Sequence, residues 1–135
     1  MFALILGAAL TLATGCARKV SASVPSAVKP AHIGDTETGI ASWYGVPYNG
    51  RLSANGEIYD MEKLTAAHRS LPFDTWVEVT NLSNNKRVDV RITDRGPFVN
   101  GRIIDLSLAA AREIDLVTAG IVRVRIKVIR KPDHI

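Results

Sequence analysis

The sequence contains a single cysteine, Cys16, which cannot form an internal disulfide. Its three histidines and this cysteine are scattered along the chain without the spacing that is typical of metal ligands. We therefore expect no disulfide that stabilises the fold and no metal site, and we expect no other cofactor.

Blocks of basic residues, which are typical of proteins that bind nucleic acid, are also missing. The chain has 17 Lys and Arg against 13 Asp and Glu, a net charge of +4. Arg123, Arg125 and Lys127 alternate with Val and Ile, which indicates the solvent-facing side of a strand. Nucleic-acid binding is therefore not expected, whereas the mild positive charge suits an anionic envelope surface or polymer.

The first 16 residues have no charged side chain, and their apolar run is too short to span a bilayer as a helix. This run, residues 2–12, has about the length of a secretory h-region. Cys16 follows the small residues 13–15, an arrangement that resembles the lipobox of bacterial lipoproteins. The resemblance implies that 1–16 is a signal segment, that Cys16 is lipidated, and that the protein faces the periplasm from the outer membrane. A plain cleaved signal is the alternative, because Ala13 stands where Leu is usual and no basic residue precedes the run.

The rest of the chain is expected to form a tether and one domain. Residues 17–38 are rich in Ala, Ser, Val, Pro, Lys and Thr and have no apolar period, so they are expected to be a flexible tether. Residues 39–130 are enough for a single core, and 131–135 form a short tail.

Alternating apolar and polar residues dominate the folded part. The segments 76–80 and 87–93 alternate on either side of a turn and predict a hairpin with one buried face. Residues 122–128 alternate in the same way and predict a third half-buried strand. Ser107 is placed to cap a short helix over 108–114. Short strands, a short helix and Gly-rich connections favour a mainly β fold, a small closed barrel.

Six blocks of the sequence resemble the rare lipoprotein A (RlpA) family. They carry the patterns ASWYG, GR-x-x-ANGE-x-YDM, LTAAH, VTNL, DRGPF and IDLS in this order. The blocks are Ala41–Gly45, Gly50–Met61, Leu64–Thr75, Val77–Asn85, Val88–Phe98 and Arg102–Ala110. The resemblance implies a six-stranded double-psi β-barrel with one or two short helices.

The resemblance also implies an activity. Family members are endolytic peptidoglycan lytic transglycosylases, which are carbon–oxygen lyases. They cleave the bonds from N-acetylmuramic acid (MurNAc) to N-acetylglucosamine (GlcNAc) in peptide-free strands and leave 1,6-anhydro-MurNAc ends. Such an enzyme would work in cell wall remodelling and daughter cell separation, as a monomer on glycan strands. The SPOR module of many members is not found after the barrel blocks, so septal targeting by that route is not expected.

Three residues match the functional positions of the family: Glu57 of ANGE, His68 of TAAH and Asp94 of DRGP. Breaking a glycosidic bond requires a carboxyl with a raised pKa that protonates the departing oxygen. In a lytic reaction the sugar's own 6-hydroxyl attacks, so one acid that later acts as base is sufficient. We expect Asp94 to be this acid, Glu57 to raise its pKa or stabilise positive charge, and His68 to hydrogen-bond a carboxyl or the substrate.

Residues around these three are the candidates for substrate binding, since sugar rings stack on aromatic faces and polar groups bind hydroxyls. Of the aromatic residues, Tyr44 and Tyr48 are expected to be exposed in a groove, and Asp105 to hold the groove together through Arg51 or Arg102. The full set of candidates is Tyr44, Tyr48, Asn49, Arg51, Asn55, Arg95 and Phe98.

Other interpretations of the same residues remain open. Asp94 could form only an Asx-type turn or pair with Arg95, Glu57 could be a solvated turn residue, and His68 could be structural. A barrel of this kind could also bind glycan without cutting it, as a glycan-binding or septal scaffolding lipoprotein, or it could hydrolyse glycan with water.

Overall fold

A computed structural model describes residues 27–133 of the chain. The predicted signal segment, the lipidation site Cys16 and residues 17–26 of the predicted tether lie outside the described residues. Within them, no helix is long and apolar enough to cross a membrane.

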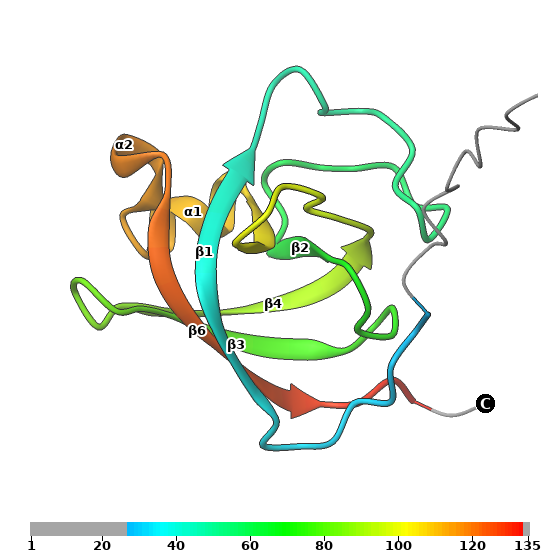
Figure 1. The fold of residues 1–135 in the computed structure, drawn as a ribbon. Coiled ribbons are helices and arrows are strands. Elements are labelled where there is room, and N and C mark those ends of the chain that lie inside the picture. Colours follow the sequence, from blue (N-terminus) through cyan, green and yellow to red (C-terminus); the bar gives the residue numbers. More distant parts are fainter. Residues whose placement is uncertain (1–26, 134–135) are drawn as a thin grey trace, which may run out of the picture.

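The described residues form six strands and two short helices (Figure 1). The strands close into a barrel in the order β1-β5-β2-β4-β3-β6. In chain order the elements are β1 (Thr36–Tyr44), β2 (Thr65–His68), β3 (Trp76–Asn81), β4 (Arg87–Asp94), β5 (Arg102–Ser107), α1 (Leu108–Glu113), α2 (Leu116–Ala119) and β6 (Val122–Arg130). The pairs β1/β5 and β2/β4 are parallel, and the other pairs are antiparallel. This mixed barrel confirms the predicted double-psi β-barrel with its short helices.

The predicted hairpin and the predicted third strand are β3, β4 and β6. Val77 lies opposite Val90 between β3 and β4, and Val79 lies opposite Ile126 between β3 and β6. Because side chains alternate along a strand, these residues point into the barrel while their charged neighbours face solvent. The largest fully buried apolar side chains are Ile92, Ile104, Leu106, Ile114, Leu116, Val77, Val79, Val90 and Val124.

The helix after β5 begins where the sequence predicts it. Ser107 has extended backbone angles, and its hydroxyl accepts a hydrogen bond from the amide of Ala110 at 3.3 Å, as an N-cap does. The carbonyl of Ile114, which follows α1, accepts hydrogen bonds from the side-chain amides of Asn81 and Asn84. These bonds fasten the end of α1 to the β3–β4 turn.

The barrel begins earlier than the predicted boundary at residue 39. β1 starts at Thr36, and 36–38 pair with 125–127 of β6. Upstream of β1, Ala31 is buried and the amide of Gly34 donates to the carbonyl of Val128 at 2.8 Å. The prediction missed this start because backbone pairing holds these residues, whose side chains are mostly exposed and show no apolar period.

Replacing a core residue of β6 should destabilise the barrel. Ile126 is 2% exposed, so Ile126→Ala should lower the free energy of unfolding by about 2–5 kcal/mol through lost apolar contact and a new cavity. The solvent-facing neighbour offers a control, because Arg125→Ala should change it by less than about 0.5 kcal/mol. Urea unfolding of both variants measures the difference, and equal effects would contradict the assigned faces of β6.

Candidate functional site

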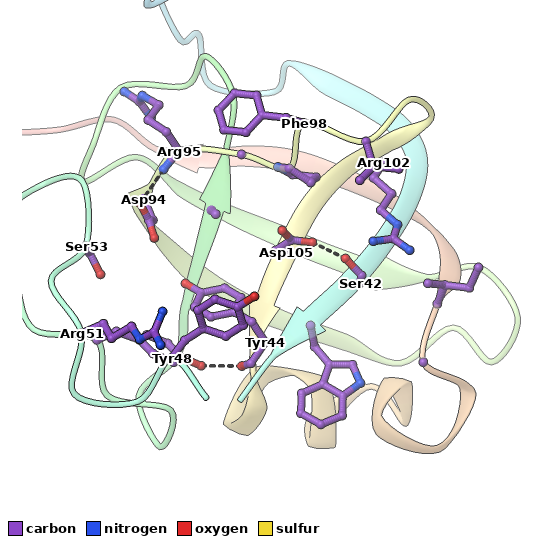
Figure 2. Close-up of a pocket in the computed structure, with 18 of the residues that line it drawn as sticks. Ser42, Tyr44, Tyr48, Arg51, Ser53, Asp94, Arg95, Phe98, Arg102 and Asp105 are labelled. Carbon is purple, nitrogen blue, oxygen red and sulfur yellow. Dashed lines mark hydrogen bonds between the residues drawn. The ribbon is translucent and has the colours of Figure 1, made fainter. Parts of the chain in front are cut away.

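The main cavity lies at the ends of β1, β4 and β5, below the loops that follow β1 and β4, and has a volume of about 700 Å³. It collects polar and aromatic side chains that are far apart in the sequence (Figure 2). The labelled members in Figure 2 are Ser42, Tyr44, Tyr48, Arg51, Ser53, Asp94, Arg95, Phe98, Arg102 and Asp105.

Two carboxyl groups face this cavity from strands on either side of β2. Ala67 of β2 is in register with Asp94 of β4 on one side and with Asp105 of β5 on the other. Two strand spacings place the Cα atoms of the aspartates about 10 Å apart. Ala67 also lines the cavity, and its methyl group leaves the space between the two carboxyl groups open.

Asp105, on β5, is partly buried. Its pKa is raised above the ordinary range, chiefly because burial disfavours the charged form. Ser42, its register partner on β1, donates a hydrogen bond to Oδ1 and works against this rise. The predicted contact through Arg51 or Arg102 is therefore corrected: Ser42 binds Asp105, and Arg102 acts on it through its charge.

Asp94 ends β4 and is held by backbone groups. Its Oδ1 accepts hydrogen bonds from the amide of Arg95 at 2.8 Å and from the amide of Ala54 at 3.0 Å. The amide of Asn55 donates to the carbonyl of Thr93 at 3.2 Å and holds the same loop. The loop of the ANGE motif is thus fastened to the end of β4, and Asp94 is fixed beside the cavity.

Glu57 does not reach the main cavity. Its carboxylate forms a two-pronged ion pair with Arg91, with distances of 2.8 and 3.0 Å, and lines a smaller neighbouring cavity. Arg91, which also binds Asp74, lowers the pKa of Glu57. The charge that we predicted beside Asp94 is thus not Glu57, and the carboxyl that shares the cavity with Asp94 is Asp105.

His68 is also absent from the lining of the main cavity. It is the neighbour of Ala67 in β2, and successive residues of a strand point to opposite faces. Its ring is buried and binds Glu37 of β1, which the sequence had placed in the tether. The sequence signal of TAAH drew attention to the histidine, whereas the alanine before it lines the cavity.

The aromatic residues differ in exposure. Tyr48 and Phe98 are 50% and 77% exposed at the cavity rim, and Arg51 lies over the Tyr48 ring at 5.5 Å. Tyr44 is more buried than predicted, because its ring packs on Tyr59 with centroids 4.3 Å apart. Burial is the main reason that the pKa of Tyr44 is raised, so its hydroxyl stays protonated.

Two further candidates serve the loops rather than the cavity. The side-chain oxygen of Asn49 accepts from the amide of Met61, and that of Asn55 accepts from the amide of Glu57, each at 3.0 Å. Neither asparagine lines the main cavity. Ser42 and Ala67 are cavity residues that the sequence did not single out, and Asp105 was expected only to hold the groove together; strand register brings the three residues together.

The Ser42 hydrogen bond gives a prediction about Asp105. Since this bond lowers the pKa of Asp105 against the effect of burial, Ser42→Ala should raise that pKa further. A side-chain carbon NMR titration of the variant and the original chain measures it. Ser83→Ala, in the exposed β3–β4 turn, is the matched control and should leave the Asp105 titration unchanged. A fall in the Asp105 pKa on Ser42→Ala would contradict the assigned hydrogen bond.

Known proteins resemble this chain in sequence and in fold. Residues 36–126 match the lytic transglycolase family. The endolytic peptidoglycan transglycosylase RlpA of Campylobacter jejuni is 55% identical over 97 residues, which is 72% of this chain and 35% of that protein. Its counterpart in Vibrio cholerae is 58% identical over 96 residues, with 71% and 36% covered. The chain therefore spans about a third of the length of these relatives.

Two solved structures have the same fold. Streptomyces papain inhibitor matches with a TM-score of 0.60 and 25% identity, over 73% of this chain and 97% of that one. A mutant expansin of Clavibacter michiganensis in complex with cellohexaose matches with a TM-score of 0.57 and 20% identity, over 75% and 54%.

Proposed function

The chain belongs to the lytic transglycolase family, and from this membership we propose that it is an endolytic peptidoglycan lytic transglycosylase. It cleaves MurNAc–GlcNAc bonds in peptide-free glycan strands and leaves 1,6-anhydro-MurNAc ends, in cell wall remodelling and daughter cell separation. The observation that carries the proposal is the pair Asp94 and Asp105 on either side of Ala67 in the main cavity.

Asp105 is the general acid in this proposal, in place of Asp94. A general acid must carry a proton when it acts, and burial raises the pKa of Asp105, the direction that favours its protonated form. It protonates the glycosidic oxygen as the bond from C1 of MurNAc to that oxygen breaks. The resulting Asp105 carboxylate then takes the proton of the 6-hydroxyl of MurNAc. In the same step the hydroxyl oxygen bonds to C1, which closes the anhydro ring. Both protons are accounted for by one carboxyl group.

Asp94 has a different role. Its carboxylate is held by the amides of Ala54 and Arg95 and faces the sugar whose ring gains positive charge. Placed there, it stabilises that charge more strongly in the transition state than in the bound substrate. Arg51, Tyr48 and Phe98 at the cavity rim bind the neighbouring sugars of the strand.

The products of the reaction test this function. Amidase-treated sacculi are incubated with the full chain, and the released fragments are analysed by mass spectrometry. Anhydro ends support the lytic reaction, reducing ends indicate a hydrolase, and strands that are bound without cleavage indicate a glycan-binding or scaffolding protein.

Substitution of the two aspartates separates their roles. Asp105→Asn keeps the shape but cannot deliver a proton, so the rate of anhydro-product release should fall by about 100-fold or more. In the original chain the rate should decline as pH rises through the raised pKa of Asp105, because the acid is then deprotonated. Asp94→Asn should slow the reaction and keep this decline at high pH, because Asp105 still supplies the proton.

The control is Asp89→Asn, on the exposed face of β4, which should leave rate and pH profile unchanged. Full activity of Asp105→Asn would remove Asp105 from the mechanism. A pH decline that vanishes in Asp94→Asn would make Asp94 the acid.

The location follows from the segment before the barrel. We infer an outer-membrane lipoprotein of the bacterial cell envelope, anchored through Cys16 and with the barrel in the periplasm.

Removing the thiol of Cys16 should release the protein from the membrane. Cys16→Ala cannot be acylated, and acyl chains hold a protein to a bilayer by about 0.8 kcal/mol per buried CH₂ group. Fractionation of cell envelopes should find the variant soluble or unprocessed and the original chain with the outer membrane. The same distribution for both, with no lipid on the original chain, would rule out the anchor.

A further inference from the structure

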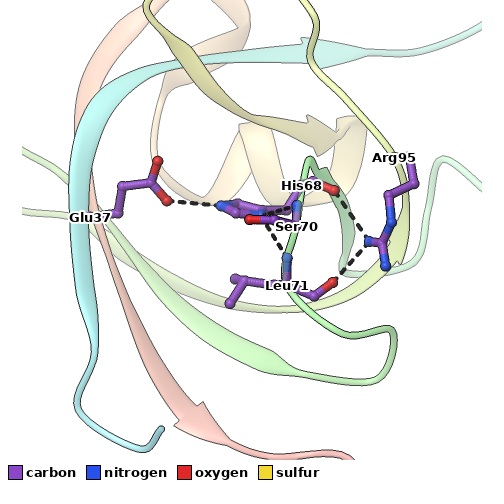
Figure 3. Close-up of polar contacts among 5 residues, drawn as sticks. All are labelled: Glu37, His68, Ser70, Leu71 and Arg95. Atoms are coloured by element: carbon purple, nitrogen blue, oxygen red, sulfur yellow. Dashed lines mark hydrogen bonds and ion pairs between the residues drawn. The ribbon is translucent and has the colours of Figure 1, made fainter. Parts of the chain in front are cut away.

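The ring of His68 has both nitrogens engaged. Nδ1 accepts hydrogen bonds from the amides of Ser70 at 3.1 Å and Leu71 at 3.0 Å, and Nε2 lies 2.9 Å from a carboxylate oxygen of Glu37 (Figure 3). Backbone amides only donate, so Nδ1 carries no proton and Nε2 donates to Glu37. The side chain is also 6% exposed. The ring is therefore bound within the protein and is turned away from the main cavity.

The hydrogen bonds of this ring shape the turn that follows β2. They hold the amides of residues 70 and 71 toward the ring. The carbonyl oxygens of His68 and Leu71, on either side of this turn, accept hydrogen bonds from Nη1 of Arg95 at 3.3 and 2.8 Å (Figure 3). The guanidinium also lies 3.8 Å from the centre of the Phe73 ring. The turn thus holds the guanidinium of Arg95 in one place.

Arg95 connects this turn with the main cavity. It lines the cavity, and its own amide donates to the carboxylate of Asp94. A shift of the turn would therefore move a charged group of the cavity wall, next to a carboxylate of the site.

We propose that His68 is a positioning residue that fixes Arg95 through the turn at residues 69–71, and that Arg95 binds the glycan strand. The proposal rests on the proposed lytic function and goes beyond it, because it removes His68 from proton transfer. Glu37 is the second member of this device, since it fixes the orientation of the ring from β1.

Two substitutions of His68 distinguish positioning from proton transfer. His68→Phe keeps a ring but removes the acceptor, so the turn and Arg95 should lose their fixed place. The KM for soluble peptide-free glycan should then rise by about 10-fold or more, with a smaller change in kcat. His68→Asn offers an amide oxygen near the position of Nδ1 and should restore most of the affinity. Equal losses of kcat in both variants would instead show that the imidazole moves a proton.

A double variant tests the path through Arg95. If His68 acts through Arg95, then His68→Phe should raise KM by less than about twofold in the Arg95→Ala background. If the KM of the double variant instead rises by the product of the two single effects, the two residues act independently and the proposal is overturned. His32→Asn is the matched control, because His32 is 73% exposed and pairs with Asp35, and its KM should equal that of the original chain.

A readout without catalysis separates this proposal from the proposed function. The side-chain Nε–H signal of Arg95 in nitrogen NMR should be sharp in the original chain and broadened in His68→Phe and in Glu37→Ala. If His68→Phe does not fold, Glu37→Ala takes its place in this measurement. A chain that releases no anhydro ends but shows these spectra refutes the lytic function and keeps the positioning, whereas an unchanged Arg95 signal in a folded variant refutes the positioning.

Discussion

The site depends on the pairing of β2 with a strand on each side. β2 has four residues, and it bonds in parallel with β4 and antiparallel with β5. Ala67 is thereby the register partner of both Asp94 and Asp105. A larger side chain at this position would fill the space between the two carboxyl groups. The separation of the acids is therefore set by backbone hydrogen bonds, and their separation from His68 is set by the alternation of side chains along one strand.

This arrangement connects the chemistry to the closure of the barrel. Ser42, Ala67, Asp94 and Asp105 come from four strands, and only the β1–β5–β2–β4 pairing brings them together. Loops complete the site: Ala54 binds the carboxylate of Asp94 through its amide. The positions of the polar groups are thus fixed before substrate arrives, as preorganised electrostatic stabilisation requires.

Much of the fold could be predicted from the sequence because β3, β4 and β6 bury one face each, and alternation shows this directly. β2 could not be predicted this way, since its four residues are all buried and show no period of two. The start of β1 was missed because Thr36 and Glu37 are exposed and are held by backbone pairing with β6. Family motifs indicated the segments of the site, and the register of distant strands decided which side chain of each segment reaches the cavity.

The choice of the acid shows why residue type alone is insufficient. Asp94 and Asp105 are chemically identical, and both lie within segments that resemble the family. Their surroundings differ: Asp94 accepts hydrogen bonds from two backbone amides at the end of β4, whereas Asp105 has the hydroxyl of Ser42 as its partner and its partial burial raises its pKa. Burial favours the protonated form, which a general acid needs. The same reasoning applies to Glu57. The ANGE motif draws attention to this carboxylate, but Arg91, 34 residues away in the sequence, pairs with it and lowers its pKa. Protonation is decided by contacts across the barrel, so the role of each carboxyl follows from the fold.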